Sequence, residues 1–124
     1  MKIINRNSKK TVASEVEVAK SPWAKTKGLM FREGIGEDSC LLMDFENEGP
    51  HSIWMFCMKF RIDVIFLDGN RRVTDIFEKV KPVSFNPGTW KVYGPSKNVK
   101  YILELKSGKI RKTGTKIGDV LSFI

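Results

Sequence analysis

The chain has 124 residues, of which 41% are hydrophobic and 10% aromatic. This length and composition predict one domain over residues 1–124 with a core of its own, and they exclude a disordered protein. The 22 Lys and Arg residues outnumber the 14 Asp and Glu residues, giving a formal net charge of +8. Such a charge attracts anions, including nucleic acids, but it identifies no reaction.

The composition also predicts where the protein works. The sequence lacks glutamine and is rich in charged residues, a combination typical of thermophiles, so we expect a thermophilic archaeal source. No apolar run follows the charged N-terminus, and the longest apolar run, residues 53–58, is far too short to span a bilayer. We therefore expect a soluble cytoplasmic protein that has no contact with membranes.

Period-two alternation of apolar residues predicts strands along most of the chain. Residues 11–19 form the first expected strand. A helix of about two turns follows, because Ser21 can cap it, Pro22 suits its first position and Gly28 can end it. Asp68-Gly69-Asn70 predicts a turn that joins two strands into a hairpin. The further expected strands are residues 40–45, 52–58, 61–67, 72–79, 99–105 and 120–124.

The fold class predicted by these elements is mainly β. We expect a small β-sandwich or barrel of about seven or eight strands with one short N-terminal helix. Residues 81–96 interrupt the pattern, because Pro and Gly recur there, yet Phe85, Trp90 and Tyr93 are large and apolar. These aromatic residues either close one end of the barrel or form a lid over a ligand.

Few residues could hold a metal ion. Cys40, Cys57 and His51 are the only Cys and His residues, and structural zinc usually requires four such ligands. We therefore expect no metal and no cofactor. The favoured interpretation makes both cysteines buried, small apolar residues, while a disulfide between them remains possible in a thermophile. His51 is expected in a loop or at a strand end, and no serine nucleophile motif accompanies it.

Asp63 is the most informative polar residue. Its strand is apolar on both faces, so it should lie inside the sheet, and a buried carboxylate requires a cation or backbone donors. Arg32, Lys59 and Arg61 are the candidate cations. A structural role is favoured, with general acid or base chemistry as the alternative.

Two further segments allow a binding function. The run Ile53-Trp54-Met55-Phe56-Cys57-Met58 is either a core strand or the wall of a pocket lined by Trp and Met. Ten Lys and Arg residues against three acidic residues lie in residues 76–124, together with Trp90, Tyr93 and Tyr101. Because these charges are spaced singly, we expect a solvated surface with only weak, salt-sensitive nucleic-acid binding.

The sequence resembles a family of uncharacterised small β-proteins catalogued as domain of unknown function number one hundred and ninety-two. The resemblance runs from about Val12 to Val120. It implies a mostly-β fold with one short helix near its start, and it implies no established activity. The residues that carry it are Gly28-Leu29-Met30-Phe31-Arg32, Trp54-Met55, Asp63-Val64-Ile65-Phe66-Leu67-Asp68, Leu103-Glu104-Leu105 with Gly108, and Ile117-Gly118-Asp119-Val120.

One departure from the family pattern bears on function. The polar Lys-Asn-Thr that usually follows Trp-Met is replaced by Phe56-Cys57-Met58. If that polar trio serves a shared catalytic site, this chain has lost most of it.

The sequence favours a non-enzymatic module that binds an unknown small molecule or protein in a depression lined by Trp and Met. The candidate ligand-binding residues are Arg32, Trp54, Met55, Asp63 and Glu104. One alternative is a hydrolase or lyase that uses Asp63 and Glu104 as paired carboxylates. Another is a weak nucleic-acid-binding module that uses the basic C-terminal third.

Overall fold

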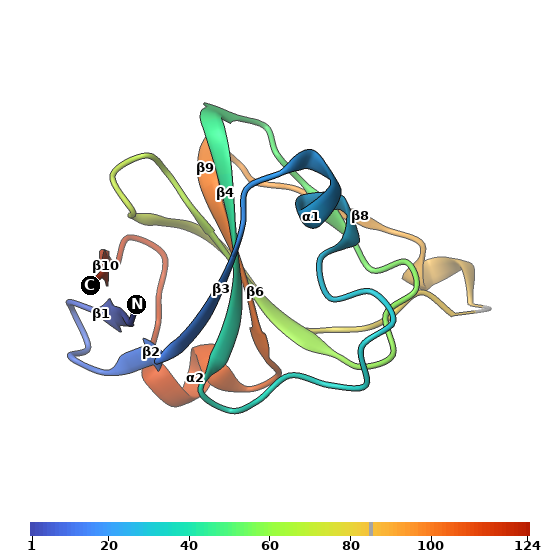
Figure 1. Cartoon of the computed structure of the whole chain (residues 1–124), viewed down its shortest axis with the longest axis horizontal. Coiled ribbons are helices and arrows are strands. Elements are labelled where there is room, and N and C mark those ends of the chain that lie inside the picture. Colours follow the sequence, from blue (N-terminus) through green and yellow to red (C-terminus); the bar gives the residue numbers. More distant parts are fainter. Residues whose placement is uncertain (85) are drawn as a thin grey trace.

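The computed structural model describes residues 1–84 and 86–124 (Figure 1). Phe85, one of the three aromatic residues of the expected loop, lies outside the described residues. The fold is mainly β, as predicted, and the described residues form ten strands and two short α-helices. None of these helices has the length and hydropathy needed to cross a membrane.

Five strands form the central sheet in the order β3-β4-β9-β6-β7. β3 and β4 run parallel, with helix α1 (Pro22–Lys27) in the connection between them, and all other neighbours are antiparallel. β6 lies between β9 and β7, and all six of its residues are buried, so the prediction of an interior strand is confirmed. The bounds are β3 Glu15–Ala19, β4 Ser39–Gly49, β9 Val99–Lys106, β6 Ile62–Leu67 and β7 Val73–Val80.

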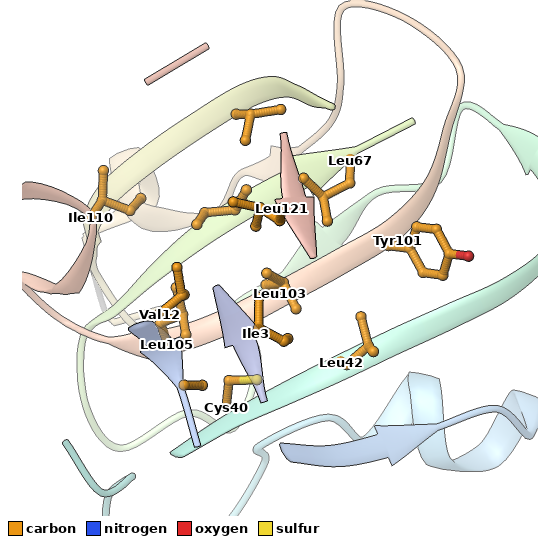
Figure 2. Packing of buried hydrophobic residues seen from close by; sticks show 13 residues of the cluster. Ile3, Val12, Cys40, Leu42, Leu67, Tyr101, Leu103, Leu105, Ile110 and Leu121 are labelled. Carbon is orange, nitrogen blue, oxygen red and sulfur yellow. The ribbon is translucent and has the colours of Figure 1, made fainter. Parts of the chain in front are cut away.

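A smaller sheet and the second helix cover one face of the central sheet. The small sheet has the order β10-β1-β2, with β1 Ile3–Asn5, β2 Thr11–Ala13 and β10 Leu121–Phe123, and the helix is α2, Lys109–Thr113. Figure 2 shows Leu103 and Leu105 of β9 packed against Ile3 and Leu121 of the small sheet. Because β1 and β10 pair, the chain termini lie side by side (Figure 1).

The opposite face carries a second core, together with helix α1, Pro22–Lys27, and the two-stranded sheet of β5, Ile53–Trp54, and β8, Val92–Tyr93. Side chains along a strand alternate between faces. On β9, Leu103 and Leu105 therefore belong to the first core, while Ile102 belongs to the second. Glu104 points to the same face as Ile102, which brings a carboxylate into the second core.

Local sequence signals account for α1 and for the hairpin. The Ser21 hydroxyl accepts a hydrogen bond from the Ala24 backbone N–H at 3.1 Å, and Pro22 opens the helix. The helix ends at Gly28, whose φ is 50° and ψ −126°, a conformation that favours glycine. β6 and β7 form the expected antiparallel hairpin, and the Asp68 carboxylate accepts backbone hydrogen bonds within its turn.

Several predicted elements are wrong in detail. The sheets are open, so the fold is not a closed barrel, and α2, β1 and β8 were not expected. The strand expected over residues 11–19 is divided at Ser14, because β2 pairs with β1 whereas β3 pairs with β4. The strand expected over residues 52–58 is limited to Ile53–Trp54, and a turn follows in which Cys57 adopts a left-handed conformation with φ of 57°.

Candidate functional site

A hollow of about 380 Å³ opens on the face that carries α1 and β5. We call it the Met/Trp hollow, because three methionines and one tryptophan contribute to its wall. Its floor comes from β4 and β9, one side from α1 and the segment after it, and the other side from β5 and β8. The lining includes Leu29, Met30, Met43, Phe45, Trp54, Met58 and Val92 as apolar residues, and Lys25, Lys27 and Glu104 as charged residues.

Glu104 is the acidic residue of this wall. Its cross-strand neighbours are Leu41 on β4 and Val64 on β6, so the carboxylate stands in a row of apolar side chains. It is 3% exposed, and its Oε1 has no hydrogen-bond partner among the described residues. Burial raises the pKa of Glu104 to about 7, against the opposing effect of the Arg32 charge. Both protonation states are therefore populated near neutral pH.

Gly28 lets the end of α1 approach this carboxylate closely. A Cβ atom at this position would lie 3.2 Å from Glu104 Oε1 and 3.2 Å from Met43 Cε. Its positive φ would also strain any other residue. The glycine that ends the helix therefore also makes room for the floor of the hollow.

The rim combines aromatic rings with positive charge. The Lys25 ammonium lies 4.5 Å from the centroid of the Phe45 ring and donates a hydrogen bond to the Asp44 carbonyl. The His51 ring stacks on Phe45 with 3.8 Å between centroids, and its Nε2 donates to the Asn47 carbonyl at 2.8 Å. His51 lies between β4 and β5, as expected of a loop residue.

Asp63 has a different role. Its carboxylate accepts hydrogen bonds from the backbone N–H groups of Lys79, Gly108 and Ile110 at 2.8, 3.1 and 2.9 Å. The last two bonds cap the start of α2, and the first holds a bulge in β7, where the register with β6 shifts. The prediction that Asp63 is buried and bonded to a cation or to backbone donors is confirmed through the backbone donors. The expected cations are wrong, because Arg32 and Lys59 pair with Glu17 and Glu33 instead.

Asp63 and Glu104 do not share a cleft. Glu104 is the cross-strand partner of Val64, and Asp63 is the partner of Leu105, so the two carboxylates point to opposite faces of the sheet. This arrangement gives no support to a hydrolase or lyase built on that pair.

Of the five candidate site residues, Trp54 and Glu104 line the Met/Trp hollow. Met55 is fully buried in the core beneath it. Arg32 lies outside the hollow and pairs with Glu17 at 2.6 Å. Gly28 and Met43 also line the hollow, although neither was among the candidate site residues. The alternation of Leu41 and Met43 indicated that they share one face of their strand, but the sequence did not show which strands pair with it.

The cysteines and the described acidic residues form no metal site. No group of three His, Cys, Asp or Glu residues in the described part of the chain could hold a metal ion. Both cysteines are free, and Cys40 is buried as expected. The expectation of a second buried thiol is wrong, because Cys57 is exposed in the left-handed turn after β5.

A second, basic hollow of about 380 Å³ lies beside the segment expected as an aromatic loop. Its lining includes Lys79, Lys81 and Lys91, together with Tyr93, whose ring packs edge-on against Phe77. The exposed Trp90 ring donates its Nε1–H to the Ser84 carbonyl and is not part of the Met/Trp hollow. The described part of this segment contains a short 3₁₀ turn, η1, Pro87–Thr89, and strand β8.

Comparison with known proteins identifies relatives of uncharacterised function. A "UPF0127 protein" from Thermococcus kodakarensis is 33% identical over 121 residues, covering 98% of this chain and 72% of the relative. A "UPF0127 protein" from Pyrococcus abyssi is 30% identical over 122 residues, covering 98% of this chain and 97% of the relative. These sources are archaeal and support the expectation of a thermophilic archaeal origin.

Two bacterial crystal structures have a similar fold. A "putative transcription regulator" from Sinorhizobium meliloti has a TM-score of 0.83 and 28% identity, covering 98% of this chain and 89% of that one. A protein of unknown function from Novosphingobium aromaticivorans has a TM-score of 0.86 and 22% identity, covering 99% and 84%. The second likeness concerns the fold alone.

The model of the DUF192 family, described as uncharacterised, matches residues 3–123, nearly the whole chain. The resemblance found in the sequence is thereby confirmed. The chain belongs to the DUF192 family.

Proposed function

We propose that this protein is a non-enzymatic module that binds a small molecule in the Met/Trp hollow. One observation carries the proposal: the Glu104 carboxylate, buried and with an unpartnered Oε1 among the described residues, borders a hollow that is otherwise largely apolar. Small-molecule sites are typically mostly apolar and contain a few polar groups that fix orientation. A buried polar atom without a partner costs free energy, which a ligand can recover by donating a hydrogen bond.

The wall of the hollow suits ligands of variable shape. Met30, Met43 and Met58 are flexible and polarisable, and methionine is common at surfaces that accept several partners. Trp54 is 52% exposed at the mouth, so its indole can cover a bound molecule. The one acidic residue of β6, Asp63, points to the other face of the sheet, and the lack of a second carboxylate from β6 beside Glu104 favours binding over hydrolysis.

Methionine methyl NMR tests this proposal. The chain has five methionines, of which three line the hollow, while Met1 is exposed and Met55 is enclosed in the core. Protein labelled at the methionine methyl groups is titrated with fragments that carry neutral, cationic or anionic heads on aromatic and alkyl bodies. We expect the signals of Met30, Met43 and Met58 to shift, the Met1 signal to stay, and the fragments to be recovered unchanged.

Paired variants locate the binding. Trp54→Ala should weaken it, whereas Trp90→Ala, which removes another exposed tryptophan outside the hollow, should not. A fragment set that moves none of the three methyl signals would overturn the proposal. So would chemical turnover of a bound fragment that persists after repurification.

A second candidate function is weak nucleic-acid binding at the basic hollow. Lys79, Lys81 and Lys91 line it, and Trp90 is 62% exposed nearby in sequence. The Sinorhizobium meliloti protein, 28% identical, is described as a "putative transcription regulator", which favours nucleic acid as a ligand class for this second candidate. The stacking surface is short, however, because Tyr101 is buried and Tyr93 packs on Phe77. Electrostatic attraction without specific recognition is the expected outcome.

A further inference from the structure

The Glu104 carboxylate has no cation in direct contact among the described residues. The positive charge that acts on it belongs to Arg32, whose guanidinium is bound to Glu17 at 2.6 Å and is partly exposed to solvent. Burial among Leu41, Val64 and Met43 removes the solvation that would stabilise the ionised form. The ionised Glu104 carboxylate therefore has no positively charged hydrogen-bond donor beside it among the described residues.

The wall beside it consists largely of aromatic rings and methionines, with Lys25 and Lys27 on the α1 side. Flexible methionines can pack against an apolar body, and aromatic faces attract an ammonium group. The protein itself shows this, because the Lys25 ammonium lies 4.5 Å from the Phe45 ring centroid at the edge of the hollow. Trp54 supplies another aromatic ring, and Met43 Cε and Glu104 Oε1 both border the space beside Gly28.

The volume decides which kind of cation fits. A hollow of about 380 Å³ is far larger than a metal ion and falls within the range of small organic ligands. Within the described residues, Glu104 also belongs to no group of three or more His, Cys, Asp or Glu residues that could hold a metal ion. A molecule with an apolar body and one ammonium group matches both the size and the chemistry.

From this geometry we infer that the Met/Trp hollow selects organic ammonium ions, with the ammonium group paired to Glu104 and the apolar body against Trp54 and the methionines. This inference rests on the proposed binding function and names its ligand class. An ammonium ion stabilises the ionised carboxylate, so its affinity should rise with pH as Glu104 loses its proton.

Variants separate the contribution of Glu104 to this pH dependence from that of other charged groups around the hollow. These groups are Lys25 and Lys27 on α1, and Arg32 beyond it, which pairs with Glu17. His51 stacks on Phe45 at the edge of the hollow, so it is the residue to control for. A His51→Gln variant should keep the pH profile of ammonium binding, and Glu104→Gln should lose it.

Three matched probes test the inference: 2-phenylethylamine, 2-phenylethanol and 3-phenylpropionate, which are cationic, neutral and anionic on similar bodies. Affinities are measured from the methyl signals of Met30, Met43 and Met58 at pH 8. We expect the amine to bind about ten- to a hundredfold more tightly than the alcohol, because a hydrogen bond between charged partners increases affinity by about that factor. In Glu104→Gln this ratio should fall to roughly threefold or less.

The pH dependence in the unmodified protein is a second measurement that needs no variant. Amine affinity should rise between pH 5.5 and 8.5, while alcohol affinity should not. If the alcohol or the carboxylate binds as tightly as the amine while the methyl signals shift, the ligand class is wrong and the proposed function stands. If none of the three probes shifts the signals although other fragments do, the ligand class is again wrong. If no fragment of any kind shifts the methyl signals, both the ligand class and the proposed function are wrong.

Discussion

Replacing Glu104 by Gln should change the pH dependence of stability, and the sign follows from its environment. Burial raises the pKa of Glu104 from 4.5 to about 7, so the folded protein holds this proton more tightly than the unfolded chain. Between these two values the native state binds more protons, and the free energy of unfolding must fall as pH rises. Well below pH 4.5 the carboxyl group is neutral in both states and contributes no pH dependence.

The magnitude follows from the same two values. A pKa raised from 4.5 to about 7 corresponds to about 3 kcal/mol of unfolding free energy lost between acid and alkaline pH. The amide that Glu104→Gln introduces cannot ionise, but its N–H groups require acceptors and cost about 1 kcal/mol. Glu104→Gln should therefore be slightly less stable than the parent at pH 4.5 and about 2 kcal/mol more stable at pH 8.5.

Unfolding by guanidinium chloride at a series of pH values measures the difference in unfolding free energy between Glu104→Gln and the parent. The effect of His51 and of other shared groups cancels when the variant is subtracted from the parent at each pH. Glu46→Gln, on the same sheet but exposed, is the matched control and should show no such crossover. A difference between variant and parent that does not change from pH 4.5 to 8.5 would refute the reasoning. A variant that loses stability relative to the parent as pH rises would indicate an unseen ion pair.

The remaining predictions concern other parts of the chain. Arg32→Gln should raise the pKa of Glu104 further, because the Arg32 charge lowers it, so the loss of unfolding free energy with rising pH should become larger and extend to higher pH in the same unfolding series. One thiol, Cys57, should react with a disulfide reagent in the folded protein, whereas Cys40, whose pKa burial raises to about 12, should require denaturant. Rapid reaction of two thiols per chain would contradict this. Stoichiometric zinc released by the reagent would contradict the expectation that the thiols bind no metal. Binding of single-stranded oligonucleotides should be weak, indifferent to sequence, and lost as the salt concentration rises toward about 150 mM. Submicromolar affinity with quenching of Trp90 would show that nucleic-acid binding had been underestimated.

Local signals made part of the fold predictable. Ser21, Pro22 and Gly28 act within a few residues of one another, so the limits of α1 could be read from the sequence. The Asp68 turn fixes the β6–β7 hairpin by the same kind of short-range hydrogen bond. The apolar character of both faces of β6 similarly indicated an interior strand.

Long-range contacts explain the failures. Helix α2 is only five residues long and has no local side-chain cap, because its cap is Asp63, which lies 45 residues before Gly108. The Met/Trp hollow depends on β4, β9 and β6 lying side by side in one register, which aligns Glu104 with Leu41 and Val64. Trp54 and Glu104 could be selected for their chemistry, but Gly28 and Met43 become site residues only through that register.

The two buried carboxylates of the sheet differ in their hydrogen bonding, and replacing Asp63 gives a test complementary to the replacement of Glu104. Its two oxygens accept three backbone N–H groups, whereas Glu104 Oε1 accepts none from the described residues. Asp63→Ala leaves three donors without an acceptor and should cost about 3–5 kcal/mol. The loss should appear at both pH 5 and pH 8.5 in guanidinium unfolding, with faster amide exchange at Ile110 in α2. A loss below roughly 1 kcal/mol would mean that water replaces the carboxylate readily. In that case α2 and the bulge of β7 would have to be held by contacts other than Asp63.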